Sequence, residues 1–327
     1  PQAPAGPHLR RRGRLPVLRP GRAQLRLRGR RGRGGQGVLP GLRRPGGPQP
    51  DPVDARFGSP LTEGLRTYRL VVAMWVRSTL TYRASFAMAL CVAVAANGLD
   101  FVAILLMFSH VDRLGGFTLG EVAFLYGTSA TAFGLAHLTV GSMDRLGRRI
   151  RDGSLDTLLV RPVPVLAQLA ADRFALRRLG RITQGALVLA YALTVLEIDW
   201  TATRLLMVPM MLVSGAALFG ALFVAGAVFQ FYAQDAAEVQ NAFTYGGTTL
   251  LQYPPTVFTR ELVASVTFVL PLAFVNWVPA SYVLDRPLPL GLPGQAAFAP
   301  PLVAAVCCVA AGLLWRVGLR AYRSTGS

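Results

Sequence analysis

Six apolar stretches of this sequence are long enough, or nearly long enough, to cross a lipid bilayer as helices. The hydrocarbon core of a bilayer requires about 20 mainly apolar residues in a spanning helix. Only 15% of the residues are charged, whereas soluble domains contain about 25%. The sequence therefore predicts an all-α, polytopic membrane protein with six transmembrane helices. The predicted spans are 85–108, 122–143, 182–196, 205–231, 262–278 and 296–315.

The positions of the arginines orient these spans. Loops on the cytoplasmic side of a membrane carry an excess of positive charge. Arginines are dense before the first span, between the second and third and after the sixth, and Arg260 lies between the fourth and fifth. The opposite loops contain only Arg113, Arg204 and Arg286. We therefore expect an even number of crossings with both termini in the cytoplasm, in a bacterial cytoplasmic (inner) membrane.

Residues 239–259 test this count, because they carry no charge and are long enough to span. A seventh span here would place the C-terminal arginines on the outer side of the membrane. The stretch contains Gly246-Gly247 and Pro254-Pro255, which disfavour a regular helix. We therefore expect a broken or membrane-dipping element on the cytoplasmic side, which is tolerable only where protein covers its backbone.

The first 50 residues differ from the rest, because they contain 13 Arg, 11 Gly, 9 Pro and no acidic residue. Such a segment buries too little apolar surface to offset its ordering entropy, so residues 1–56 are predicted to be disordered. One interpretation is a basic tail for nucleic acid or anionic lipid. The other is upstream sequence translated ahead of a start near Val53 or Leu61, since the first methionine is Met74. We favour the second and expect no nucleic-acid partner, because like charge alone specifies none.

Residues 57–83 are predicted to form an amphipathic helix ahead of the first span. At 100° per residue, the arginines and Glu63 share one side, while Tyr68, Val71 and Trp75 lie opposite. A helix of this kind lies in the membrane interface with its apolar face toward the acyl chains. It is a plain anchor or an element that also receives force from a partner, and the two interpretations are compatible.

The segment 144–181 is the largest polar piece between spans, and it begins with dense charge. Gly153 can end a first helix, and Pro162 stops the next element. Three leucines between them stand at i, i+3 and i+4, so they form a short apolar face on the intervening helix. The face consists of Leu155, Leu158 and Leu159, with Asp156 and Arg161 beside it.

An apolar face held at the cytoplasmic surface needs something to dock against. In a transporter driven by a separate ATPase, that partner would be the nucleotide-binding subunit. The alternative is an ordinary basic connection whose positive charge only sets the topology.

Three stretches of the sequence carry a family resemblance. The first is Arg-Asp-Gly-Ser-Leu-Asp-Thr-Leu-Leu-Val-Arg-Pro at 151–162, the second includes Asn-Ala-Phe-Thr-Tyr-Gly-Gly within 235–254, and the third is 271–280. Together they resemble the permeases of ABC-2 type transporters, in the branch of six-span half-permeases, over about residues 61–323. The resemblance implies a permease domain at 84–327 that pairs with a second permease subunit, identical or related, and with ATP-binding subunits in trans. It also implies that coupling to the ATPase involves Arg151, Gly153, Leu155, Asp156, Leu158, Leu159, Arg161 and Pro162.

The chain contains no lysine, because all 34 basic residues are arginine. This excludes a Walker A lysine, a kinase-type lysine and a Schiff-base lysine. His137 has no second histidine, cysteine or carboxylate at metal-ligand spacing, and no side chains form a catalytic constellation. We therefore expect no enzyme activity, no metal and no cofactor in this chain, with ATP and Mg²⁺ bound by the partner subunit.

Polar side chains inside the predicted spans are candidates for a translocation path. Asn97 and Asp100 stand at i and i+3 in the first span and share a face, and His137 in the second span is a possible partner for Asp100. Such residues tend to face a bundle interior or a wet cavity, where they line a substrate path or relay a proton. The alternative places Asp100 near the outer interface, paired locally with His110 or Arg113.

These observations predict the membrane-spanning permease subunit of an ATP-driven ABC-2 type transporter, an exporter energised by a separate ATP-binding subunit. Two alternatives stay open at this point. One is an ATP-independent, proton-coupled secondary transporter that uses Asp100 and His137, and the other is a non-transporting membrane scaffold.

Overall fold

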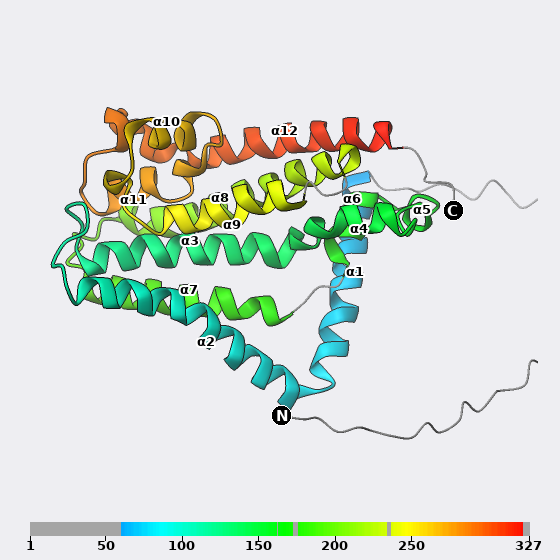
Figure 1. The fold of residues 1–327 in the computed structure, drawn as a ribbon, viewed down its shortest axis with the longest axis horizontal. Helices are drawn as coiled ribbons and strands as arrows, with labels where there is room; N and C mark the ends of the chain where they lie inside the picture. Colours follow the sequence, from blue (N-terminus) through cyan, green and yellow to red (C-terminus); the bar gives the residue numbers. More distant parts are fainter. Residues whose placement is uncertain (1–59, 162, 173–175, 234–236, 323–327) are drawn as a thin grey trace, which may run out of the picture. The chain divides into compact units, whose positions relative to one another are not determined.

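A computed structural model describes residues 60–161, 163–172, 176–233 and 237–322. Within these residues the chain is helical, and the one β-type pairing is an isolated bridge between Leu114 and Phe117. The predicted all-α fold is therefore confirmed, while the predicted disordered segment 1–56 lies outside the described residues. Long helices run side by side in a bundle (Figure 1). They are α2 (Arg83–Phe108), α3 (Leu119–Val140), α7 (Leu179–Val195), α8 (Ala202–Tyr232) and α12 (Pro300–Ala321).

Three of the described helices are long and apolar enough to cross a membrane by themselves, namely α2, α8 and α12. A fourth span is counted if two bent helical pieces between Arg260 and Val283 are taken as one. By length and composition the described residues therefore contain three spans, or up to four, rather than the predicted six. α7 is apolar but has only 17 residues.

Helix α3 lies at the centre of the bundle, and this explains its mixed composition. Sixteen of its 22 residues are buried, including three glycines, two threonines and one serine. Glycines allow its close contact with α7: a Cβ at Gly127 would lie 2.6 Å from the backbone nitrogen of Leu189, and one at Gly185 would lie 2.8 Å from that of Thr131. A helix covered by protein needs less apolar surface than one that faces lipid.

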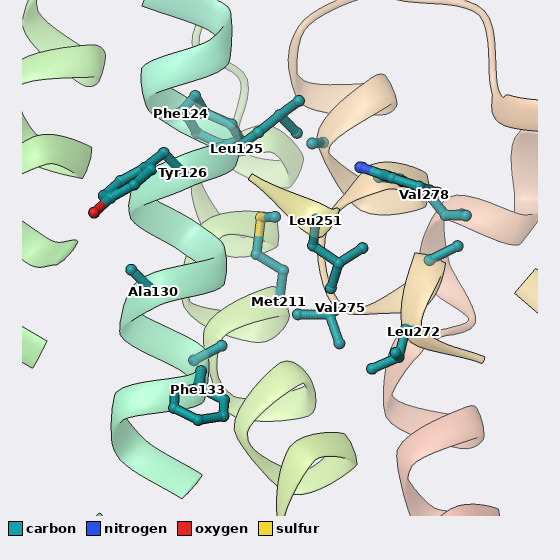
Figure 2. Packing of buried hydrophobic residues seen from close by; sticks show 14 of the residues in the cluster. Phe124, Leu125, Tyr126, Ala130, Phe133, Met211, Leu251, Leu272, Val275 and Val278 are labelled. Carbon is teal, nitrogen blue, oxygen red and sulfur yellow. The ribbon is translucent and has the colours of Figure 1, made fainter. Parts of the chain in front are cut away.

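The main apolar core lies where α3 meets α8 and the C-terminal third of the chain. Figure 2 shows Leu125, Met211 and Leu251 lying together in the space between these elements, with Val275 beside them. Asn276 is fully buried in this core, and its side-chain amide donates to the carbonyls of Leu125 and Leu251 at 3.0 and 2.9 Å. These bonds tie three segments that are far apart in the sequence.

Helix α9 (Ala237–Leu251) is continuous through Gly246 and Gly247, so the break expected there is absent. A Cβ at Gly247 would lie 2.7 Å from the Leu272 side chain, which shows that this glycine serves close packing. α9 lies along α3, and the hydroxyl groups of Ser129 and Thr248 are 3.1 Å apart. The prediction of a break at the two glycines is therefore wrong, because glycine inside a well-packed helix need not interrupt it, and the helix ends instead at Leu251, before Pro254 and Pro255.

The chain leaves α9 at the end of the bundle where the loop between α2 and α3 lies. The hydroxyl of Thr256 donates to the carbonyl of Gly115 over 2.7 Å, and the indole of Trp277 donates to the carbonyl of Tyr253 over 2.9 Å. α9 therefore extends along the bundle from one end toward the other.

The predicted fifth span, 262–278, is not one straight helix. α10 (Arg260–Phe268) and the following pieces at Leu272–Val283, which include α11 (Trp277–Val283), meet at an angle of 79°. Arg260 before this pair and Arg286 after it line the same cavity, so the chain enters and returns at one end of the bundle. The pair is therefore a bent element that turns back on itself.

This geometry also corrects the position of Arg260. The arginine count assigned Arg260 to the cytoplasmic side and Arg286 to the opposite side, but both line one cavity together with Gly115. The predicted separation of Arg260 from Arg286 is therefore wrong, because a hydropathy window cannot distinguish a span from an apolar segment that turns back.

Helix α1 (Pro60–Leu80) runs across the direction of the bundle at the end where α12 ends (Figure 1). Tyr68, Val71 and Trp75 are partly buried and its described arginines are exposed, as the helical periodicity predicted. The hydroxyl of Tyr68 donates to the carbonyl of Thr139 over 3.0 Å, which fixes α1 to the end of α3. A helix therefore lies where the sequence predicted one, with these three apolar residues on its more buried side, and its position in the membrane interface stays a prediction.

Candidate functional site

The segment between α3 and α7 consists of short helices at the end of the bundle where α1 crosses (Figure 1). Gly153 adopts a positive φ of 64° and ends α4, as the sequence predicted, because glycine enters the left-handed region without a steric penalty. Pro162 lies outside the described residues. The elements are η1 (Gly141–Arg145), α4 (Leu146–Arg151), α5 (Asp156–Leu159) and α6 (Val165–Ala171).

A second apolar cluster fastens this segment to the long helices. Leu155 and Leu158 belong to it, with 0% and 8% of their surfaces exposed. The cluster extends into α8 through Val224 and Val228 and into α12 through Trp315. The segment, α8 and α12 therefore share one core.

The three-leucine docking face expected from the sequence is only partly available. Leu155 and Leu158 are used inside the chain, whereas Leu159 is 39% exposed and Val160 is 85% exposed. The expectation of a free face is therefore wrong for Leu155 and Leu158, because both side chains are buried in this second apolar cluster. The exposed apolar tip consists of Leu159 and Val160, flanked by the exposed residues Arg151 and Arg161.

Gln230 near the end of α8 is fully buried and organises the base of the segment. Its side-chain oxygen accepts a hydrogen bond from the backbone amide of Gly147. Its side-chain nitrogen donates to the carbonyl of Met143 at 3.2 Å and to the side-chain oxygen of Gln240 at 2.7 Å. One amide therefore joins α8 to η1, α4 and α9.

Further polar contacts hold the outer part of the segment. Arg149 forms an ion pair with Asp172, and the Gln168 side chain donates to the carbonyl of Leu158 over 3.2 Å. The hydroxyl of Tyr322, which follows α12, donates to Asp156 over 2.9 Å. Asp156 is thus a link to α12, a role that its sequence position alone did not reveal.

Asp144 in η1 is largely enclosed by the segment. Burial raises the pKa of this carboxyl, although the arginines at 178, 145 and 148 act in the opposite direction. One of its carboxylate oxygens, Oδ1, is buried and accepts no hydrogen bond from the described residues. Asp144, Arg145 and Arg148 line a pocket of about 430 Å³ with Gln230 and Glu238.

The candidate path residues of the first span do not form a cluster with His137. Asp100 is exposed on α2, and the side-chain amide of Asn97 donates to the carbonyl of Ala93 within the same helix. The carbonyl of Asn97 accepts a hydrogen bond from the hydroxyl of Tyr126 at 3.2 Å. This contact places the polar part of α2 beside the first half of α3.

His137 lies in the second half of α3, among aromatic rings. Its ring stacks on Phe223 with centroids 5.8 Å apart, and its Nε2 is 3.2 Å from the hydroxyl of Tyr245. Tyr126 and His137 are eleven residues apart, which is about 16 Å along a helix. The expected pairing of Asp100 with His137 is therefore wrong, because the two lie at different depths of the bundle. His110, the local alternative, is bonded to Ser109 and to the carbonyl of Leu106.

Arg181 is a functional candidate that the sequence assigned only to the cytoplasmic loop. It stands in the first turn of α7, and its guanidinium lies 4.6 Å from the ring centroid of Phe133. It interacts electrostatically with Tyr126, Asp100 and Tyr245. Its position one residue before the predicted third span is the signal that marks it as a residue at the membrane boundary.

Most of the chain matches the model of a known protein family. A family model described as ABC-2 family transporter protein matches residues 94–326, which is more than two thirds of the chain. No curated protein and no solved structure matches the chain. The match includes Asn97, Asp100, His137 and the whole segment between α3 and α7, whereas α1 precedes it.

Proposed function

The chain belongs to the ABC-2 family of membrane transporter proteins, and from that premise we propose that it is the permease subunit of an ATP-driven exporter whose ATP is bound and hydrolysed by a separate subunit. The absence of lysine supports this division of labour, because a Walker A motif requires one. ATP and Mg²⁺ then belong to the partner, and this chain contributes the membrane path.

The observation that carries the proposal is the exposed apolar tip of Leu159 and Val160 on a segment whose base is built into the bundle core. An exposed apolar patch ringed by charge is typical of a protein contact. Arg151 and Arg161 beside it suit an acidic rim on the partner. The ATP-binding subunit docks on this tip.

The segment is attached rigidly to the long helices, so a movement of the docked subunit is transmitted to them. Leu155 and Leu158 share a core with α8 and α12, and Gln230 joins α8 to α4 and α9. Packed interiors move as units because they have few voids to absorb a displacement. A push on α5 therefore tilts α8 and α12, and α1 follows through the bond between Tyr68 and Thr139.

The course of the helices supports a six-crossing topology, which goes beyond the three or four spans given by length and composition. α2, α3, α7, α8, α9 and α12 each run along the bundle, and α10–α11 returns to the end from which it started. The fifth crossing is α9 rather than 262–278. With Arg260 moved to the outer side, the arginines near α1, η1 and the end of α12 still outnumber it, so both termini lie in the cytoplasm of a bacterial inner membrane.

A second permease subunit, identical or related, covers the exposed face of α2. Within this helix only Ile104 is buried, while Met88, Val92 and Leu99 are more than 60% exposed. Lipid would satisfy these apolar residues, but a carboxylate such as Asp100 requires water or a polar partner at this depth. The path for the exported molecule runs between the two subunits, with Asn97 and Asp100 along it.

Copurification with the partner tests the proposal. The tagged chain is isolated from native membranes in mild detergent, and the eluate is examined for a stoichiometric ATP-binding subunit and vanadate-sensitive ATPase activity. The variant Val160→Glu should lose the partner, because it places a charge in the contact while altering only an exposed side chain. The matched control is Val257→Glu, an exposed valine at the opposite end of the bundle.

The outcomes separate the candidate functions. Loss of the ATPase in Val160→Glu but not in Val257→Glu supports docking at the tip. Retention of the ATPase in both variants contradicts the proposed contact. A single polypeptide without ATPase, together with transport that ionophores abolish, would instead identify a secondary transporter that depends on Asp100. No partner and no transport would indicate a scaffold.

A further inference from the structure

A cavity of about 430 Å³ opens at the end of the bundle opposite α4–α6. Three separate segments line it: the loop between α2 and α3, the turn that leads into α10, and the chain that follows α11. The bond between Thr256 and Gly115 closes the first segment against the second. Its volume falls in the range of pockets that hold small molecules.

The charged residues that line this cavity are all positive. Arg260 and Arg286 are the two, and the lining includes no carboxylate. Arg286 is held from behind, since its guanidinium donates to Glu121 at 2.8 and 3.0 Å and lies 5.2 Å from the ring centroid of Phe117. It is therefore fixed in position at the wall.

Arg260 is exposed and differently placed. It is the first residue of α10, and Thr259 before it gives no side-chain cap. A cation at the start of a helix adds to the positive end of the helix dipole, and Glu261 in the same turn offsets part of this charge. Arg260 therefore adds an exposed positive charge to the cavity lining at the start of α10.

The remaining walls of the cavity are apolar and suit an alkyl chain. Phe117 and Val263 are buried at the back of the cavity, with 8% and 5% of their surfaces exposed. Phe258, Leu288 and Leu290 complete the walls. A pocket for a small inorganic anion needs no such surface, whereas an alkyl chain buried there leaves water.

The backbone supplies an independent observation. Among the described residues, the non-glycine residues in the left-handed region are Asp285 at a φ of 54° and Leu290 at a φ of 60°; Asp285 directly precedes the cavity wall formed by residues 286–290, and Leu290 ends it. Such conformations persist only where the surroundings enforce them, and they cluster at ligand sites. Asp285 is held by an ion pair with Arg204 at 3.5 Å.

From these features we infer that the cavity is a binding site for an anionic amphiphile, with a phosphate between Arg260 and Arg286 and an alkyl chain against Phe258 and Leu288. The inference goes beyond the proposed function and does not depend on the ATP-binding subunit. An acidic phospholipid and a free single-chain acid present the same chemistry to this site.

The test is native mass spectrometry of the full chain in a neutral maltoside detergent titrated with dodecyl phosphate. We expect one saturable adduct. Arg260→Gln should weaken it about tenfold, which is the loss of roughly one charge-assisted hydrogen bond. The matched control Arg113→Gln, an exposed arginine at the same end that does not line the cavity, should bind like the parent chain.

Further arms make the result decisive. Equal weakening in Arg113→Gln, or no weakening in Arg260→Gln, would overturn the site. Equal binding of dodecyltrimethylammonium, or equal competition by inorganic phosphate alone, would overturn its chemistry. Retention of phosphatidylglycerol after extraction from lipid nanodiscs, lost in Arg260→Gln, assigns the lipid as the source. Binding of dodecyl phosphate without retained phosphatidylglycerol assigns a free amphiphile, and both of these results support the site.

Discussion

The hydroxyl of Tyr322 donates a hydrogen bond to Oδ1 of Asp156 over 2.9 Å, which ties the end of α12 to α5 across 166 residues of sequence. The variant Tyr322→Phe removes only this hydroxyl. Because the pair is partly exposed, we expect the free energy of unfolding in detergent to fall by about 1 kcal/mol. Tyr191→Phe, an exposed tyrosine of α7, is the control and should leave unfolding unchanged.

The same bond gives a pH dependence. Burial, and then the hydrogen bond to Asp156, raise the pKa of Tyr322 above its ordinary value. The contribution of the bond to stability is thus fully present below about pH 10, the usual tyrosine pKa, and is lost as the pH rises through the raised value. Tyr322→Phe should lack this alkaline loss, and an identical decline in both chains would refute the assignment.

Replacing Gln230, at the base of the segment, should lower the free energy of unfolding. Gln230→Leu keeps the approximate volume but leaves the Gly147 amide and the Met143 carbonyl buried without this partner. Each such group costs about 1–3 kcal/mol, so we expect a loss of about 2–4 kcal/mol in unfolding. Gln295→Leu, at an exposed position in η6 (Gly294–Phe298), should change the value by less than about 0.5 kcal/mol. Equal effects of the two variants would show that Gln230 is not a structural tie.

The buried carboxyl of Asp144 should make the free energy of unfolding depend on pH in the acid range. Its pKa is raised, chiefly by burial, so the folded chain retains this proton to higher pH than the unfolded chain does. Stability therefore falls as the pH rises from about 3.9, the ordinary aspartate pKa, through the raised value. Asp144→Asn should remove this fall and unfold no more easily at pH 7 than the parent chain. Unfolding curves between pH 4 and 7 measure it, with the exposed Asp152→Asn as the control; a steeper fall in Asp144→Asn contradicts the prediction.

Two glycines test the close packing of α3 on α7. A Cβ at Gly127 would lie 2.6 Å from the Leu189 backbone, whereas one at Gly98 on α2 would meet nothing within 4 Å. Gly127→Ala should therefore destabilise by about 1–3 kcal/mol through overpacking. Gly98→Ala should be neutral or stabilise by up to about 1 kcal/mol, because alanine favours the helix. Thermal unfolding of both variants in the same detergent decides the matter, and the reverse order would contradict the packing.

Local patterns predicted a helix at Pro60–Leu80 and the turn after α4. The burial of Tyr68, Val71 and Trp75 follows from helical periodicity, and the positive φ of Gly153 follows from the chemistry of glycine. The same kind of reasoning failed for Gly246 and Gly247, since their effect depends on whether a neighbour fills the space beside them. Leu272 does so at Gly247.

The sequence by itself determined that this protein is helical, that it belongs in a membrane and that it carries no ATP-binding lysine, because composition and hydropathy are sums over local residues. Only the tertiary structure decided which residues are available for function. It buried Leu155 and left Val160 exposed, and it separated Asp100 from His137. It also returned the chain at Arg286 to the end where Arg260 lies. Each of these depends on which helix packs against which face, and that choice is made by contacts between residues far apart in the sequence.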